Sequence, residues 1–110
     1  MSNSASRFIT RKGERRETGR EPVLIAADLR RPGRTPFRTR IRDLSQTGCR
    51  CETLSRMQQG DRIWLTLPGF APLEAVIRWS TPMGFGCEWI KPIHPSVFDH
   101  IRKSYPDITF

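Results

Sequence analysis

The sequence predicts an all-β fold, an antiparallel β-barrel followed by one short C-terminal helix. Three observations lead to this prediction. Apolar and polar residues alternate through most of the chain after residue 22, as they do in half-buried strands. A turn signal rich in Gly or Pro separates most of these runs from the next. Near residue 94 the apolar spacing becomes helical.

The composition fits one domain with an uneven charge. The chain has 110 residues, of which 36% are hydrophobic, enough for one modest core. Residues 1–42 hold 12 basic and 4 acidic side chains, whereas residues 43–110 hold 7 of each, so the net charge of +8 arises in the first part. Nearly all the basic residues are arginines, which pair with phosphate in a two-pronged fork. This bias favours a nucleotide partner over a membrane.

The chain contains no apolar run long enough to span a bilayer. Its N-terminus also lacks the apolar core of a signal peptide. The three cysteines are odd in number, and Cys49 and Cys51 share one face of a strand, where they would act as small apolar residues. A metal site of Cys49, Cys51 and Cys87 with a histidine is conceivable, but paired C-x-x-C spacing is missing. We therefore expect a reduced, cytoplasmic protein without a metal.

The first strand is expected at residues 23–29, directly after Pro22. A loop marked by Pro32-Gly33 leads to a second strand at residues 37–42. This second run alternates strictly, with arginines on one face, and it is the clearest strand signal in the chain. Its inward row is Phe37, Thr39 and Ile41.

A short polar turn from Asp43 to Gly48 connects the second strand to a third at residues 49–52. Asp43 and Ser45 lie two residues apart, so both side chains can aim at one concavity. Leu44 points the other way and anchors the turn. Gly48 permits a positive φ and a close backbone approach. The pattern is typical of a binding turn, and a purely structural turn could carry the same residues.

Three further strands are expected at residues 62–67, 73–80 and 85–89. Pro-Gly and Pro-Met-Gly turns separate them. Their inward rows are Ile63, Leu65 and Leu67; Leu73, Ala75, Ile77 and Trp79; and Phe85, Cys87 and Trp89. Many short strands at this spacing favour a closed barrel over a flat sheet with open edges.

The stretch from His94 to Ser104 has apolar residues at helical spacing and basic residues near its end. A helix this short is not stable alone in water. We therefore expect Val97, Phe98 and Ile101 to cover an open end or side of the barrel.

Two arginines, Arg16 and Arg20, stand four residues apart ahead of the first strand. Each guanidinium can fork onto a phosphate or a guanine edge, while Asp43 can accept from guanine N1–H and its amino group. The charged residues before position 20 show no apolar periodicity, so we expect a flexible basic N-terminal arm that folds over the turn. An arm that is only solvated, or that attracts any polyanion, would have the same composition.

Together, R-x-x-x-R at Arg16–Arg20 and D-x-S-x-x-G at Asp43–Gly48 resemble the motifs of the PilZ domain family of cyclic di-GMP receptors. The resemblance covers about residues 14–104. It implies a six-stranded antiparallel β-barrel with a C-terminal helix. We therefore expect a single PilZ-like domain at 14–110, and the polar, charged composition at the N-terminus predicts a disordered tail at 1–13. It also implies that the arm and the barrel surface hold the ligand between them, and that Arg15 contacts a second stacked dinucleotide. The implied ligand-binding residues are Arg15, Arg16, Arg20, Asp43, Ser45 and Gly48.

The leading functional hypothesis is therefore a stand-alone cyclic di-GMP receptor that needs no cofactor and signals to a downstream protein partner. We do not expect an enzyme, because His94 and His100 flank a short helix and are better suited to capping or surface exposure. One alternative is a basic barrel that binds single-stranded nucleic acid, but the basic part lacks an aromatic stacking platform, since Phe37 is expected to face the core. Another is a protein-interaction barrel that works without ligand.

Overall fold

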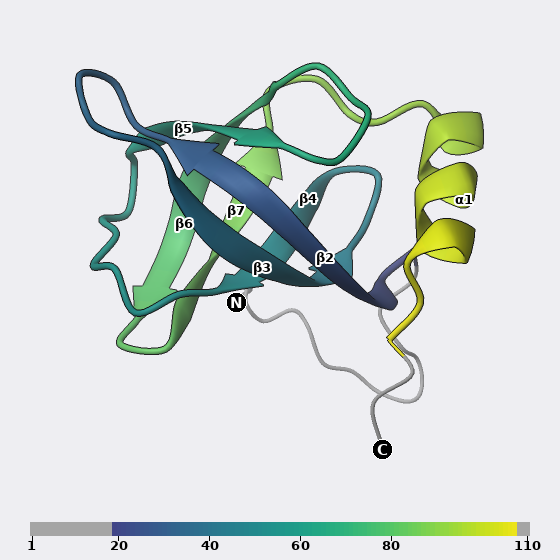
Figure 1. Ribbon diagram of the computed structural model, residues 1–110, viewed down its shortest axis with the longest axis horizontal. Coiled ribbons are helices and arrows are strands. Elements are labelled where there is room, and N and C mark those ends of the chain that lie inside the picture. The colour runs from purple at the N-terminus through teal and green to yellow at the C-terminus, as the bar shows by residue number, and fades with distance from the viewer. Residues whose placement is uncertain (1–18, 108–110) are drawn as a thin grey trace, which may run out of the picture.

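The computed structural model describes residues 19–107, which form a closed antiparallel barrel of six strands and one C-terminal helix (Figure 1). The all-β prediction is confirmed. The elements are β2 (Glu21–Arg30), β3 (Phe37–Leu44), β4 (Gly48–Glu52), β5 (Arg62–Thr66), β6 (Leu73–Thr81), β7 (Gly84–Trp89) and α1 (Pro95–Ser104). The expected tail at 1–13 and the residues Arg15 and Arg16 lie outside the described residues. No helix in the described part is long and apolar enough to cross a membrane.

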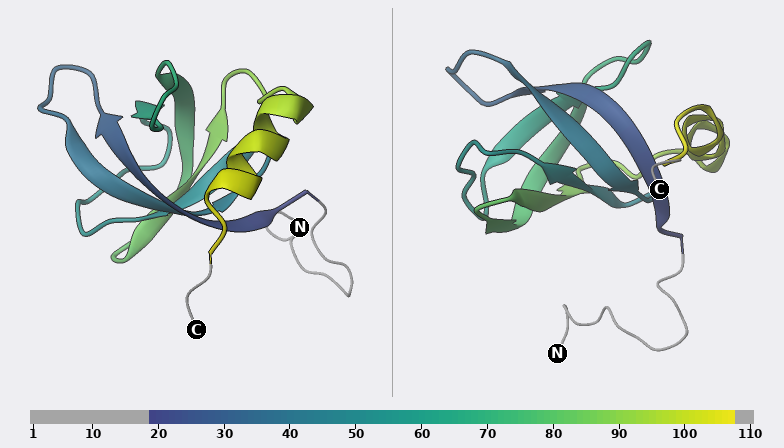
Figure 2. Two further views of the ribbon diagram at one scale, coloured as in Figure 1. Left: turned by 45° about the vertical axis from the view of Figure 1, so that its right-hand side comes forward. Right: turned by 60° about the horizontal axis from the view of Figure 1, so that its bottom comes forward.

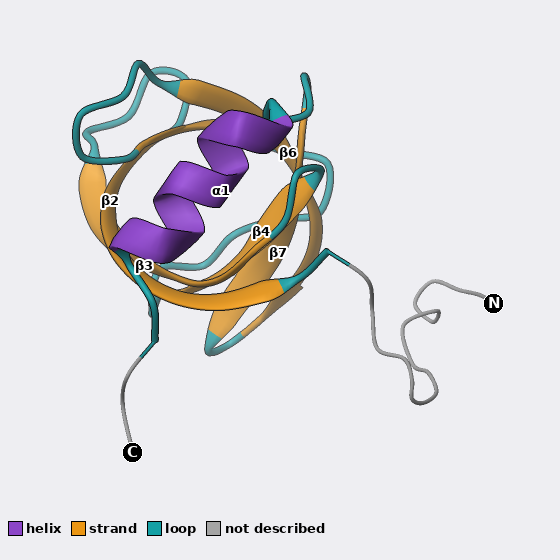
Figure 3. Ribbon diagram, turned by 90° about the vertical axis from the view of Figure 1, so that its right-hand side faces the viewer, coloured by secondary structure: helices purple, strands orange, loops and turns teal. Residues whose placement is uncertain are grey.

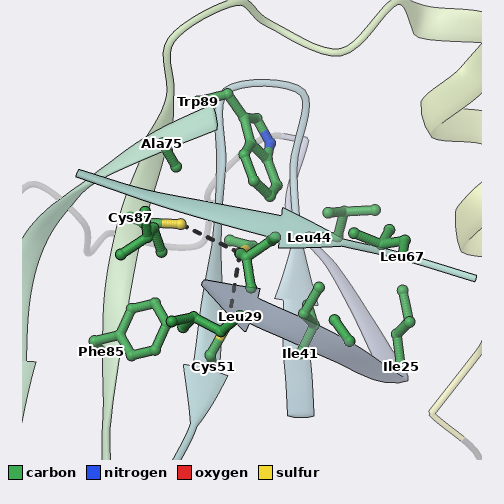
Figure 4. Close-up of a cluster of buried hydrophobic side chains, with 14 of the residues drawn as sticks. Ile25, Leu29, Ile41, Leu44, Cys51, Leu67, Ala75, Phe85, Cys87 and Trp89 are labelled. Carbon is green, nitrogen blue, oxygen red and sulfur yellow. Dashed lines mark hydrogen bonds between the residues drawn. The ribbon is translucent and has the colours of Figure 1, made fainter. Parts of the chain in front are cut away.

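The spatial order of the strands is β2-β3-β4-β7-β6-β5, and pairing of β2 with β5 closes the barrel. Most strands extend a residue or two beyond the predicted runs, and Pro22 lies inside β2 rather than before it. The side chains that point inward fill the barrel as the period of two predicts (Figure 4). Those with almost no exposed surface include Ile25, Leu29, Ile41, Leu44, Ile63, Leu65, Ile77 and Phe85.

The three cysteines lie within this core, as predicted for small apolar residues. The Sγ atom of Cys49 is 3.7 Å from that of Cys51 and 3.4 Å from that of Cys87 (Figure 4). Burial raises the pKa of the Cys49 thiol, and hydrogen bonding to the other two thiols raises it further. Cys49 therefore stays protonated near neutral pH. Among the described residues, no group of three or more His, Cys, Asp or Glu side chains could hold a metal ion.

Trp79 was predicted to face the core, and this prediction was wrong, because the residue is 44% exposed. The register of β6 against β7 shifts between Ile77 and Trp79, so that Arg78 is an extra residue. Trp79 consequently lies opposite Gly86 on the outer face instead of opposite Phe85 on the inner one. Such a β-bulge reverses the alternation on one strand only.

A second bulge lies between Ile41 and Asp43, where β3 pairs with β4. Arg42 is the extra residue here, and its guanidinium donates to Glu52 (3.2 Å) and Asp107 (2.9 Å). The hydrogen bond to Asp107 makes the largest contribution to the raised pKa of Arg42, and the hydrogen bond to Glu52 makes the next largest. The bulge leaves Leu44 fully buried, as predicted, and turns Asp43 to the outer face.

Helix α1 lies across one end of the barrel (Figure 3). Phe98 and Ile101 are buried there, as predicted, whereas Val97 is 36% exposed. The buried stripe follows the i, i+3 spacing of Phe98 and Ile101, and Val97 lies beside it on the helix surface. His94 caps the helix, with Nδ1 accepting from the backbone N–H of Ser96 at 3.1 Å, and His100 is exposed. Both histidines thus have the roles expected of them.

Candidate functional site

Ser45 makes the hydrogen bonds that stabilise the turn between β3 and β4. The Ser45 Oγ atom accepts from the backbone N–H groups of Thr47 (3.2 Å) and Gly48 (3.1 Å), and the Ser45 N–H donates to the Gly48 carbonyl at 2.9 Å. This is the local side-chain-to-backbone bonding that serine offers a turn. Ser45 therefore holds the turn in shape in addition to any role in binding.

Neighbouring elements hold the same turn from the core side. The indole Nε1 of Trp89 donates to the Ser45 carbonyl (3.3 Å), and its backbone N–H donates to the Thr47 carbonyl (2.8 Å). The N–H of Ile93 donates to the Gln46 carbonyl at 2.8 Å. Because Trp89 and Ile93 are both buried, the turn is fixed to the core before any ligand arrives.

Gly48 is required for close approach but not for a positive φ. The described glycines with positive φ are Gly19, Gly33, Gly60 and Gly69, so that part of the prediction was wrong. Gly48 is instead the first residue of β4, paired with Glu88 in extended conformation. A Cβ atom at this position would collide with the carbonyl oxygen of Cys87, so only glycine fits here.

Asp43 is held between two arginines on the outer face. Arg50 Nε donates to Asp43 Oδ2 at 2.6 Å, and Arg20 Nη2 lies 3.4 Å from the same oxygen. The Asp43 side chain is 23% exposed, so part of it is open to solvent. Among the described residues none donates to Oδ1, which leaves one carboxylate oxygen available as an acceptor.

The structure thus brings together two residues that the sequence analysis placed in one site, Arg20 and Asp43, although they are 23 positions apart. Gly19, with a φ of 82°, turns the chain just before Arg20. The other two predicted arginines, Arg15 and Arg16, lie outside the described residues.

Arg50 is a site residue that the sequence analysis missed. It lies on the outer face of β4, opposite Asp43 on one side and Gly86 on the other. The signal was present in the sequence, because a residue between the inward-facing Cys49 and Cys51 must point outward. Its pairing with Asp43 could not be foreseen, since it depends on the bulge at Arg42.

An outward-facing row therefore crosses five neighbouring strands, and we call it the outer row. It consists of Trp79, Gly86, Arg50, Asp43 and Pro22. A Cβ atom on Gly86 would collide with the indole of Trp79, so the ring lies over β7. Counting pairs back from the Pro82-Met83 turn would have placed Trp79 opposite Gly86, a signal that the sequence analysis did not use.

The outer row combines three kinds of recognition chemistry. A carboxylate oxygen can accept from the N–H groups of a guanine edge, the guanidinium groups of Arg50 and the neighbouring Arg20 can pair with phosphate, and an exposed indole can stack on a flat base. The fold and this face together define a β-barrel with a candidate surface for an anionic, base-containing ligand. The residues of the outer row, all of which are described, include no nucleophile paired with a general base.

Among protein-family models, that of the PilZ domain matches residues 14–105 of the chain. The chain belongs to the PilZ domain family, whose members are cyclic di-GMP receptor domains rather than enzymes. The resemblance drawn from the two motifs is thereby confirmed. No curated protein matches the chain.

Proposed function

We propose that this protein is a stand-alone cyclic di-GMP receptor that couples ligand binding to contact with a protein partner. The observation that supports this most directly is the placement of Asp43, whose carboxylate is turned outward between Arg20 and Arg50 beside a rigid turn. The family makes cyclic di-GMP the expected ligand. The ligand is bound and released unchanged, so the proposal includes no cofactor and no reaction. It also keeps the cytoplasmic location expected from the sequence.

In this proposal each residue has a distinct role. Asp43 accepts from the N1–H or amino group of one guanine through Oδ1, and Arg50 holds the carboxylate in place through Oδ2. Arg20, with Arg15 and Arg16 of the preceding segment, pairs with the phosphates and guanine edges.

Two further groups complete the proposed site. Ser45 and Gly48 shape the turn against which the ligand rests. The exposed face of Trp79 offers a stacking surface at the far end of the outer row.

Calorimetric titration tests the proposal. The wild-type protein should bind cyclic di-GMP saturably and discriminate against cyclic di-AMP. Arg20→Ala should weaken binding roughly ten- to hundredfold, because a hydrogen bond to a charged group is worth about 1.5 to 3 kcal/mol. A matched control is Arg62→Ala, since Arg62 pairs with Glu74 at 2.9 Å outside the site and its loss should leave affinity unchanged.

The same titration with a single-stranded oligonucleotide at two salt concentrations separates the alternatives. Strongly salt-dependent binding with no preference for guanine would indicate a nucleic-acid-binding barrel instead. Absence of binding to either ligand would indicate a protein-interaction barrel that works without ligand.

A further inference from the structure

The arginines of the described region divide into two groups. Eight of them form ion pairs with carboxylates: Arg20, Arg38, Arg40, Arg42, Arg50, Arg62, Arg78 and Arg102. Within residues 19–107 the other four pair with no carboxylate: Arg30, Arg31, Arg34 and Arg56. The other described arginines of the barrel are paired, so these four unpaired positive charges indicate a surface that could bind an anionic partner.

These four arginines lie together rather than scattered. Arg30 is the last residue of β2, Arg31 and Arg34 follow in the connection from β2 to β3, and Arg56 belongs to the connection from β4 to β5. Arg31 Nη1 donates to the Arg56 carbonyl at 3.3 Å, which joins the two connections. Figures 1 and 2 show the β2–β3 loop projecting at the end of the barrel away from α1, whereas the Ser45–Thr47 turn lies on the α1 side.

Exposed apolar side chains border the same end. Leu54 is 87% exposed and Met83 is 70% exposed. The N–H of Thr53 donates to the Met83 carbonyl at 3.1 Å, so the β6–β7 turn adjoins the start of the β4–β5 loop. Met57, buried at 4% exposure, anchors that loop to the core. We call the surface formed by the four unpaired arginines with Leu54 and Met83 the arginine end.

Two of the guanidinium groups are held in place by aromatic rings. The guanidinium carbon of Arg30 lies 4.5 Å from the centre of the Trp64 ring, and that of Arg31 lies 5.6 Å from the centre of Phe37. The Nε atom of Arg31 is buried without a hydrogen-bond partner among the described residues. Stacked guanidiniums lose less conformational freedom when they pair with an anion, so this surface is prepared for a ligand of defined geometry.

We infer that the arginine end docks an acidic protein segment that carries apolar side chains between its carboxylates. Carboxylates match the planar fork of arginine, and the four cationic side chains of the arginine end are all arginine rather than lysine. A nucleic acid would satisfy the charges but leave Leu54 and Met83 without an apolar partner. An anionic membrane surface has no fixed arrangement of charges, so guanidinium groups held in stacked positions would not strengthen its binding. This inference rests on the proposed function in one respect, the assumption that the receptor contacts a protein partner.

Fluorescence anisotropy of the full chain with a labelled peptide that alternates Glu and Leu tests this docking surface. We expect the wild type to bind this peptide. It should bind a Gln-for-Glu or Ser-for-Leu peptide at least about tenfold more weakly. The double variant Arg34→Ala/Arg56→Ala should lose at least about tenfold in affinity, and Leu54→Ser a few-fold. The matched double variant Arg38→Ala/Arg62→Ala, which removes paired arginines, should bind as the wild type does.

Three results would overturn the inference. They are failure of the wild type to bind the acidic peptide, unchanged binding by Arg34→Ala/Arg56→Ala, and tighter binding to a single-stranded oligonucleotide or to phosphatidylglycerol vesicles than to the peptide. Cyclic di-GMP titration of the same variants separates this inference from the proposed function. None of the substituted residues belongs to the outer row, so ligand affinity should be unchanged in all of them, whether or not the peptide binds.

Discussion

At the scale of single residues, the Asp43 carboxylate decides which base the site can prefer. It is the group in the outer row that can accept from guanine N–H groups while two arginines hold it from one side. Asp43→Asn keeps the shape but replaces one oxygen by a donor. We expect it to weaken cyclic di-GMP binding about tenfold or more and to reduce the preference over cyclic di-AMP.

Paired calorimetric titrations with the two dinucleotides measure this change. Unfolding by denaturant provides the control: the side chains of Asp43 and Arg50 are both partly exposed, and an ion pair near the surface contributes about 1 kcal/mol or less, so the free energy of unfolding should change little. Unaltered selectivity in Asp43→Asn would remove this residue from base recognition.

Gly48 is expected to act on stability independently of any ligand. The Cβ atom of an alanine here would meet the Cys87 carbonyl, a backbone atom of the adjacent strand that can move only if the pairing of β4 with β7 opens. Overpacking of this kind typically costs about 1 to 3 kcal/mol. Denaturant unfolding of Gly48→Ala without ligand should show this loss, whereas the exposed neighbour Thr47→Ala should stay close to wild type.

At the scale of elements, the β6 bulge determines where Trp79 lies. By inserting Arg78 it moves the indole from the core to the outer row, over Gly86 and on the side of Arg50. If a guanine stacks on this ring, Trp79→Ala removes about 1 to 3 kcal/mol of binding free energy, at least about a fivefold loss of affinity.

Trp79→Phe should retain part of this affinity, and Trp64→Phe should have no effect, because the Trp64 ring is covered by Arg30. Titration with cyclic di-GMP compares the three variants. Wild-type affinity in Trp79→Ala would show that the ligand does not reach this part of the outer row.

Helix α1 is joined to the barrel through one narrow stripe. Phe98 is 8% exposed and Val97, one residue earlier, is 36% exposed. Phe98→Ala should therefore cost about 3 to 5 kcal/mol of unfolding free energy, whereas Val97→Ala should stay within about 0.5 kcal/mol of wild type. Thermal and denaturant unfolding measure both, and equal losses in the two variants would contradict the burial pattern.

At the scale of the whole molecule, the closed barrel separates two surfaces. The β3–β4 turn lies on the side of α1, and the arginine end lies away from it (Figure 2). A ligand at one and a protein segment at the other could be bound together, since neither uses the residues of the other.

The number of ligands is also a property of the whole chain. The family resemblance assigns Arg15 to a second stacked dinucleotide, so the wild type should bind two cyclic di-GMP molecules per chain and Arg15→Leu should bind one. The stoichiometry from calorimetry measures this directly, with Arg62→Ala as the control that should keep the wild-type value. Identical stoichiometry in the wild type and Arg15→Leu would contradict the assignment of Arg15 to the second dinucleotide.

Local patterns in the sequence were sufficient for the architecture. Alternation placed all six strands, the turn residues separated them, and the spacing of Phe98 and Ile101 predicted the helix. The two short motifs led to the PilZ family, which the family comparison confirms. These features depend on neighbours within a few positions along the chain, because side-chain direction and turn chemistry are set by the local backbone.

The tertiary structure alone decided the composition of the outer surface. Trp79 and Asp43 face outward because each follows a bulge, and a bulge exists only relative to the register of a partner strand. For the same reason Arg50 meets Asp43, and Gly48 is needed for contact with Cys87 rather than for its φ. Which arginines lack a carboxylate likewise depends on the neighbours that folding supplies from distant parts of the chain.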